Sequence, residues 1–300
     1  METLDFENDL KQEIHLMYSD LGLKISIRNK LNEMLLDYLT INRKLVRPKP
    51  RQVFINPDLE IKLFNHAKSG EIESLKKLFL LGKNVNFFQS KKLFETKFHD
   101  HLLYEWNIYH FHLSTQLEKK SKFVKQTNQL LFAHISDEKV IFLDIENHKE
   151  GIFADTKWLE ILDNHFPEVL EPYKAEDILD VFPNVNSVER QTLWNKGYTL
   201  GMTKVNNKIY HSQGIGRVTS GHSIFVTKQA NEISRWVNQL NTHFMERLDE
   251  ICSGLKLDKT QAVFRLQFGK VTLELIEKKS NTILLTYPYL FNFNEQTVNN

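Results

Sequence analysis

The feature that most constrains the fold is a change in hydrophobic periodicity near Tyr104. Before this residue, apolar side chains recur every three or four positions, which is the spacing of one face of a helix. From Tyr104 onward the segment YEWNIYHFHLS has a period of two, and NQLLFAHIS and KVIFLDIENH follow as further strand-like segments. A helical region followed by a group of strands indicates an α+β fold.

The N-terminal part, residues 1–95, is expected to be helical. Residues 1–45 carry apolar side chains at helical spacing, and a second helical pair is expected over 57–86. Between them, the prolines of segment 47–52 deny a helix its backbone donors and favour extended geometry. We therefore expect a linker near 47–52.

Residues 96–175 are expected to form a small central antiparallel sheet with a helix over about 155–173. The second and third strands are joined by only Asp137, Glu138 and Lys139, which is a hairpin-length connection. Residues 176–300 form the last expected region. They comprise a glycine-rich segment over 197–221, an amphipathic helix over 227–252 and a three-strand antiparallel meander at the end.

Composition limits where such a chain works and what it binds. The formal net charge is only +1, so any contact with nucleic acid requires a local basic patch. Cys252 is the only cysteine, which excludes an internal disulfide and a cysteine-based zinc site. The acidic N-terminus does not resemble a signal peptide, and we find no run of about 18 apolar residues. We expect a cytoplasmic protein with no membrane partner.

Histidines are concentrated on the central strands. Side chains two positions apart share a face of a strand, so His110 and His112 lie together, with Tyr109 and Phe111 opposite. On the third strand Asp144, Glu146 and His148 are expected on one face, with Ile141, Leu143 and Ile145 on the other. This pattern predicts a sheet with one apolar face and one polar, histidine-bearing face, which suits acid–base chemistry.

Positive charges accompany these histidines. The connection STQLEKKSKFVKQTN supplies Lys119, Lys120, Lys122 and Lys125, which could hold a phosphodiester backbone. The segment GIGRVTSGHS carries Arg217 and His222 among backbone amides that could cradle phosphate, although a plain turn between strands is the competing interpretation. RNA is the partner that these groups indicate.

The leading hypothesis is an RNA-directed, metal-independent endonuclease. One histidine would remove the 2′-hydroxyl proton, another group would protonate the leaving oxygen, and a Lys or Arg would stabilise the charge that develops. We assign the acid–base groups to His110, His112 and His148, and phosphate binding to the four lysines, Arg217 and His222. This chemistry requires no metal and no cofactor.

The order of an aromatic strand, a basic loop and the hairpin LLFAHISDEKVIFLDIENHKE resembles RelE/HigB-type ribonuclease toxins over residues 104–149. The resemblance implies a small antiparallel sheet preceded by helices, RNA cleavage by basic and acid–base side chains, and a toxin-like effector of the stress or phage-defence type. It also implies an inhibitory protein partner. The arginine that the family carries near the hairpin is absent, and we take Arg217, later in the chain, as the candidate.

Two other functions remain open. The first is a non-enzymatic module that binds nucleic acid or protein through the helical pair and the basic loop, with the histidines packed as structural residues. The second is a metal-dependent phosphodiester hydrolase in which His110 and His112, with His134 or His148, bind a divalent cation completed by Asp144 or Glu146. The sequence His99-Asp100-His101 is interpreted as a polar loop.

Overall fold

The computed structural model describes residues 4–20, 30–119, 121–214, 216–269 and 272–288, which divide into two compact units. The first unit combines residues 1–43 with residues 225–293, and the second is made mainly of residues 44–224. The first unit therefore joins both ends of the chain, a pairing that the division into 1–95, 96–175 and 176–300 did not include. The α+β class expected from the sequence is confirmed.

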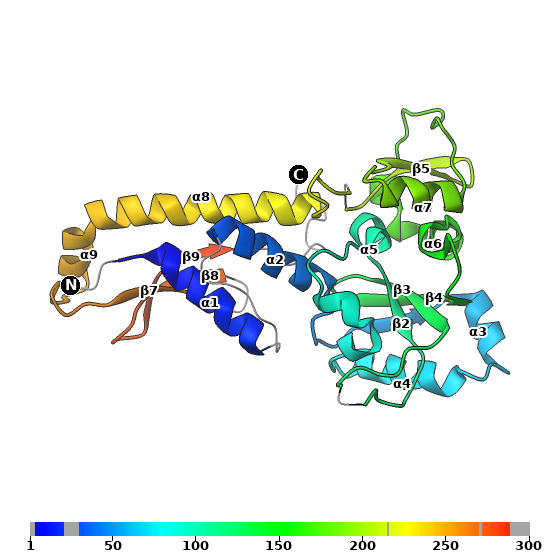
Figure 1. Ribbon diagram of the computed structural model, residues 1–300, viewed down its shortest axis with the longest axis horizontal. Coiled ribbons are helices and arrows are strands. Elements are labelled where there is room, and N and C mark those ends of the chain that lie inside the picture. The colour runs from blue at the N-terminus through cyan, green and yellow to red at the C-terminus, as the bar shows by residue number, and fades with distance from the viewer. Residues whose placement is uncertain (1–3, 21–29, 120, 215, 270–271, 289–300) are drawn as a thin grey trace. The chain divides into compact units, whose positions relative to one another are not determined.

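The second unit is built on a four-stranded sheet with the order β1-β4-β3-β2, of which β2, β3 and β4 are labelled in Figure 1. The strands β2 (Ile108–His112), β3 (Gln129–Ile135) and β4 (Lys139–Asn147) are antiparallel neighbours, as the short connection predicts. At one edge β1 (Gln52–Ile55) pairs in parallel with β4. The segment expected to be a linker thus leads directly into a strand, and Arg51 anchors its end by donating from Nε to the Ser136 carbonyl at 3.0 Å.

Both faces of this sheet are covered, each by its own apolar cluster. Helices α3 (Pro57–Leu63) and α4 (Ser69–Leu80) contribute to the cluster that contains Phe111. Helices α5 (His101–Trp106) and α6 (Lys157–His165) contribute to the other, where the Trp158 ring stacks on Phe132 with centroids 4.0 Å apart. The prediction of a polar face is therefore wrong for most of the sheet. Apart from the histidines, this face carries apolar side chains such as Leu130 and Phe132, which pack in the same cluster as the residues of α6.

A β-bulge corrects the expected faces of β4. The register between β3 and β4 shifts between Phe132 and Ala133, so that Phe132 pairs with Asp144 while Ala133 pairs with Phe142. The extra residue is Leu143, which belongs to the same cluster as Phe132, whereas Ile145 belongs to the opposite cluster. Strict alternation placed Leu143 and Ile145 on one face, and this was wrong because a bulge resets the alternation.

The remaining elements of the second unit are short. Helix α7 (Ser187–Asn195) begins with a capping box made by Asn186 and Glu189, and β5 (Met202–Val205) pairs with β6 (Lys208–His211) as a hairpin. Single 3₁₀ turns lie at 86–88, 91–94, 152–154, 167–169 and 171–173. The helix expected over 155–173 ends at His165, since Pro167 follows.

The first unit contains α1 (Phe6–Asp20), α2 (Leu31–Lys44), α8 (Ile224–Glu246) and α9 (Leu248–Gly254). Its strands β7 (Phe264–Phe268), β8 (Thr272–Glu277) and β9 (Thr282–Pro288) form the expected antiparallel meander. Phe244 connects the helices to the meander, with its ring 5.4 Å from Phe6 and 4.9 Å from Phe264. Within the described residues, no helix combines the length and the apolar character that a bilayer span requires.

Candidate active site

A cavity of about 690 Å³ lies within the second unit and is lined by most of the histidines singled out in the sequence. Its polar lining residues are Ser90, Lys91, Lys92, Lys97, His99, Asp100, His101, His110, His112, Gln126, His148, Gln191, Asn195 and Arg217. Its apolar lining residues are Phe98, Leu102, Leu130, Phe153 and Trp194. Concave sites of this size with convergent polar groups are typical of binding and catalytic sites.

Separate elements bring the acid–base groups to this cavity. His110 and His112 belong to the last three residues of β2, where the covered face of the sheet ends. His148 follows directly after β4, and its backbone N–H donates to the Asn128 carbonyl at 2.7 Å. The three histidines assigned to catalysis therefore line one cavity.

The His112 ring is held by the backbone of Thr127, which lies just before β3. Its Nδ1 atom lies 3.1 Å from the backbone nitrogen of Thr127 and 3.2 Å from the carbonyl oxygen of the same residue. When the ring is neutral, Nδ1 accepts from this N–H and the proton sits on Nε2. When the ring is charged, Nδ1–H donates to the carbonyl. Both protonation states are thus accommodated without rotating the ring.

The His110 ring has a different environment. Its Nδ1 atom lies 3.6 Å from Oδ2 of Asp100, which is ion-pair distance but longer than a hydrogen bond. Its ring centroid lies 4.9 Å from that of Phe153, and the His148 ring lies 5.2 Å from the same phenyl group. Phe153 therefore contacts the rings of two of the candidate acid–base groups.

Burial favours the neutral form of the His110 and His112 rings. Desolvation lowers the pKa of His110 and of His112, although Asp100 opposes the effect at His110. Two further histidines on the cavity wall are shifted more strongly, because desolvation lowers the pKa of His99 to about 4 and that of His101 to about 3. A neutral imidazole can accept a proton, so the wall is rich in bases.

The glycine-rich segment reaches this site and contributes Arg217. One guanidinium nitrogen of Arg217 donates to the Trp194 carbonyl. The segment packs tightly against its neighbours: the position of a Cβ on Gly214 is 1.4 Å from the Tyr104 carbonyl oxygen, and on Gly221 it is 2.5 Å from the His99 ring. Only glycine permits this approach, which fixes where Arg217 enters the cavity.

Glu105 is a buried carboxyl group that interacts electrostatically with Arg217 but does not cancel its positive charge. Burial raises the pKa of Glu105 to about 8, even though the charges of Arg190 and Arg217 lower it. At pH 7 this carboxyl is therefore mainly protonated. The positive charge of Arg217 stays available to an anion in the cavity.

Lysines that the sequence interpretation did not select line the same wall. Lys91, Lys92 and Lys97 come from the segment just before α5. Lys91 pairs with Glu118, whereas Lys92 lies over the Phe98 ring, 5.3 Å from its centroid. With Arg217 they outnumber Asp100, the one carboxylate among the lining residues, so the cavity favours an anionic ligand.

The lysines selected from the sequence occupy other places. Lys119, Lys122 and Lys125 are exposed and are not among the lining residues, and Lys120 lies outside the described residues. Their loop is instead anchored by Phe123, which packs edge-on against Phe87 and Phe94 and leaves Gln126 at the cavity. His222 is not among the lining residues, but its ring lies 5.7 Å from that of His99, which is one of them.

The segment interpreted as a polar loop, His99-Asp100-His101, is part of the cavity wall. Asp100 is the N-cap of α5, and its Oδ1 atom accepts from the Leu103 N–H at 3.0 Å. His101 stacks on Trp194 with centroids 5.0 Å apart. The sequence signal was the N-cap pattern Asp-x-x-Leu before a short apolar helix, preceded by Lys91, Lys92 and Lys97.

Three donors of the metal-site alternative, His134, Asp144 and Glu146, do not join His110, His112 and His148 at the cavity. His134 is buried, pairs across the sheet with Ile108 and Ile141, and is not among the cavity's lining residues. Asp144 and Glu146 are both engaged by Lys157. In the described part of the chain, no group of three or more His, Cys, Asp or Glu side chains is arranged to hold a metal ion.

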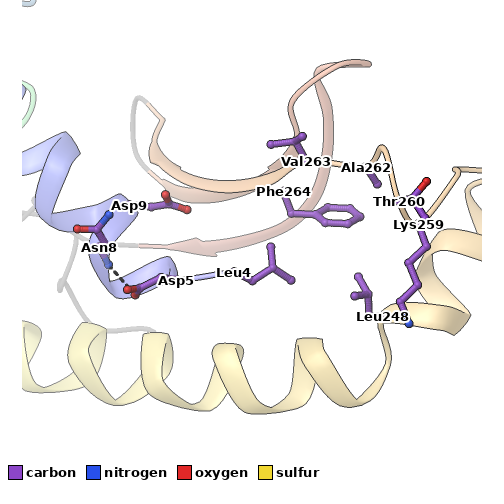
Figure 2. A pocket seen from close by; sticks show the side chains of 10 residues that line it. All are labelled: Leu4, Asp5, Asn8, Asp9, Leu248, Lys259, Thr260, Ala262, Val263 and Phe264. Carbon is purple, nitrogen blue, oxygen red and sulfur yellow. Dashed lines mark hydrogen bonds between the residues drawn. The ribbon is translucent and has the colours of Figure 1, made fainter. Parts of the chain in front are cut away.

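A second cavity, of about 720 Å³, lies in the first unit between the start of α1 and the approach to β7 (Figure 2). Its polar groups serve the fold. Asp5 accepts from the Asn8 N–H at 3.0 Å, Asp9 accepts from the Leu266 N–H at 3.1 Å, and Lys259 pairs with Asp249. It contains no histidine among its described lining residues, so the histidine-lined cavity is the stronger candidate.

Comparisons with protein-family models, with curated proteins and with solved structures found no match for this chain.

Proposed function

We propose that the protein is a metal-independent endoribonuclease of the toxin-like effector class, acting on single-stranded RNA. The observation that carries the proposal is that His110, His112 and His148 line one cavity together with Arg217 and three lysines. Two imidazoles and a cluster of positive charges are the groups that phosphodiester cleavage requires when no metal takes part.

The proposal includes the following proton-transfer roles. His110 accepts the proton of a 2′-hydroxyl group, and O2′ attacks the adjacent phosphorus. His112, protonated on Nε2 and donating from Nδ1 to Thr127, gives its proton to the departing O5′. The O2′–P bond forms as the P–O5′ bond breaks, which yields a 2′,3′-cyclic phosphate and a 5′-hydroxyl end. Arg217 and Lys92 stabilise the charge on the phosphoryl oxygens.

The cavity's size and lining favour a single strand. A volume of about 690 Å³ accommodates one or two nucleotides but not a duplex. Phe98, Phe153 and Trp194 are lining residues, and aromatic side chains contact unpaired bases. A flexible strand can place one phosphodiester at the histidines while its neighbours remain outside.

The resemblance to RelE/HigB-type toxins is part of this proposal. Helices α3 and α4 precede the antiparallel strands β2, β3 and β4, which is the order that the resemblance implies. Arg217 would take the role of the arginine that is absent near the hairpin. The inhibitory protein partner remains a proposal that follows from the same resemblance.

The proposal is tested by incubating the purified 300-residue chain with single-stranded RNA in EDTA. We expect cleavage, and we expect His110→Ala and His112→Ala each to lower the rate by about 10²- to 10⁴-fold, which is the usual contribution of a general acid or base. His211→Ala is a matched control, since this histidine is exposed and is not among the lining residues.

Failure to cut any of a diverse set of RNAs would overturn the proposal. Equal rates in all three variants would overturn the assignment of the histidines. RNA binding without cleavage would favour the non-enzymatic binding module instead.

A further inference from the structure

Asp100 stands out among the cavity residues because it is the one carboxylate in a lining that also holds five histidines and four cationic side chains. Its two oxygens face different groups. Oδ1 accepts from the Leu103 N–H at 3.0 Å and so caps α5, while Oδ2 lies 3.6 Å from Nδ1 of His110. The cap holds the carboxylate in place, so its second oxygen is directed at the imidazole by the backbone of α5.

The nitrogen that Asp100 faces has no competing acceptor. The Nδ1 atom of His110 is buried and makes no hydrogen bond with any described residue. A buried ring nitrogen without a partner is costly, and the nearest group that could accept a proton from it is Oδ2 of Asp100. A shift of a few tenths of an ångström closes the contact, as is common when a ligand fills a site.

We propose that Asp100 is a positioning residue that holds the proton of neutral His110 on Nδ1, which leaves Nε2 as the unprotonated base. The His110 ring also faces His112 on the same strand, His148 after β4, and the rings of Phe132 and Phe153. None of these presents a second carboxylate. Asp100 itself feels the buried ammonium of Lys44, which donates to the Glu95 carbonyl at 2.7 Å.

The proposal makes the two cavity histidines complementary. Thr127 offers His112 an N–H donor, which places the proton of the neutral ring on Nε2. Asp100 offers His110 only acceptor oxygens, which places the proton on Nδ1. His110 is therefore set up as the base, and His112 becomes the proton donor once its Nδ1 is also protonated and donates to the Thr127 carbonyl. The catalytic consequence rests on the proposed function, but the tautomer of His110 does not.

The test is the variant Asp100→Asn. Asparagine is as good an N-cap as aspartate, so α5 should be preserved, but its amide can donate to Nδ1. Long-range ¹H–¹⁵N correlation spectra of the histidine rings, recorded at pH 7.5, report the tautomer directly. We expect the proton of His110 on Nδ1 in the wild-type protein and on Nε2 in the variant. Asp180→Asn, which removes an exposed carboxylate that is not among the lining residues, should leave the His110 signals unchanged.

Activity supplies the second readout. We expect Asp100→Asn to lower kcat for RNA cleavage by about 10- to 100-fold with KM changed less than about 2-fold, because the base is present but wrongly protonated. A wild-type His110 protonated on Nε2, or a tautomer unaffected by Asp100→Asn, overturns the inference and leaves the nuclease proposal standing. A wild-type protein that shows the expected tautomers but cuts no RNA overturns the proposed function and leaves the inference about Asp100 and His110 standing.

Discussion

Two histidines on one strand, His110 and His112, differ mainly in what their Nδ1 atoms face. For His110 it is a carboxylate, and for His112 it is a backbone amide with both a donor and an acceptor. Residue type alone could not distinguish them, since both are histidines two positions apart. The difference arises because Asp100, the N-cap of α5, lies beside the His110 ring, whereas Thr127, just before β3, lies beside the His112 ring.

The pH dependence of cleavage follows from these environments. The proposed mechanism requires His110 neutral and His112 protonated, and burial lowers the pKa of both below the usual 6.5. As pH rises above the pKa of His112 the proton donor is lost, and as pH falls below the pKa of His110 the base is lost. We therefore expect kcat/KM for RNA to peak below pH 6.5 and to fall as pH rises through neutrality. A profile that rises steadily from pH 6 to pH 8 would contradict this assignment.

Sequence alternation was sufficient to place His110 and His112 on one face, because strand geometry is local. It could not identify Asp100, Lys92 or Lys97, whose position at the cavity depends on how the segment before α5 folds back over β2. Lys119, Lys122 and Lys125 were selected because they are close in sequence to the histidines. Their loop is held by the packing of Phe123 against Phe87 and Phe94. These lysines are therefore close to the histidines in sequence but do not line the cavity with them.

At the level of elements, the glycine-rich segment is the least obvious part of the site from sequence. It matches no phosphate-binding motif, yet Gly214 packs on the backbone of α5, with its N–H donating to the Glu105 carbonyl at 3.0 Å. The contact between Gly214 and α5 fixes the position of the glycine-rich segment, and Arg217 in this segment lines the cavity. The bulge in β4 was equally invisible, because it depends on the pairing with β3 rather than on the composition of β4 itself.

Gly214→Ala tests the role of this segment. An added Cβ would meet the Tyr104 carbonyl oxygen at 1.4 Å, so the backbone has to move apart and Arg217 has to move with it. We expect the free energy of unfolding to fall by about 1–3 kcal/mol, as for other overpacked positions, and the affinity for single-stranded RNA to fall as well. Urea unfolding and a binding titration measure the two effects.

Gly201→Ala is the matched control, because a Cβ there meets no atom within 4 Å. It should change the free energy of unfolding by less than about 0.5 kcal/mol. If the two glycine variants behave alike, the close approach of this segment to α5 does not position Arg217.

At the scale of the whole molecule, the cavity is made entirely by residues between Ser90 and Arg217, within the continuous part of the second unit. The first unit is held by contacts between the two ends of the chain, such as the ion pair of Arg265 with Glu13 at 2.9 Å. Helix and strand periodicity predicted the pieces of both units. It could not predict that the ends join, because such a pairing leaves no local pattern.

We propose above all that the protein uses imidazoles to activate a 2′-hydroxyl group. The most direct measurement compares a single-stranded RNA with the same strand carrying 2′-deoxy sugars throughout, both in EDTA. We predict cleavage of the RNA alone, with 2′,3′-cyclic phosphate and 5′-hydroxyl ends, and binding of both strands. Cleavage of the deoxy strand at a similar rate, or products with 5′-phosphate ends, would contradict the account.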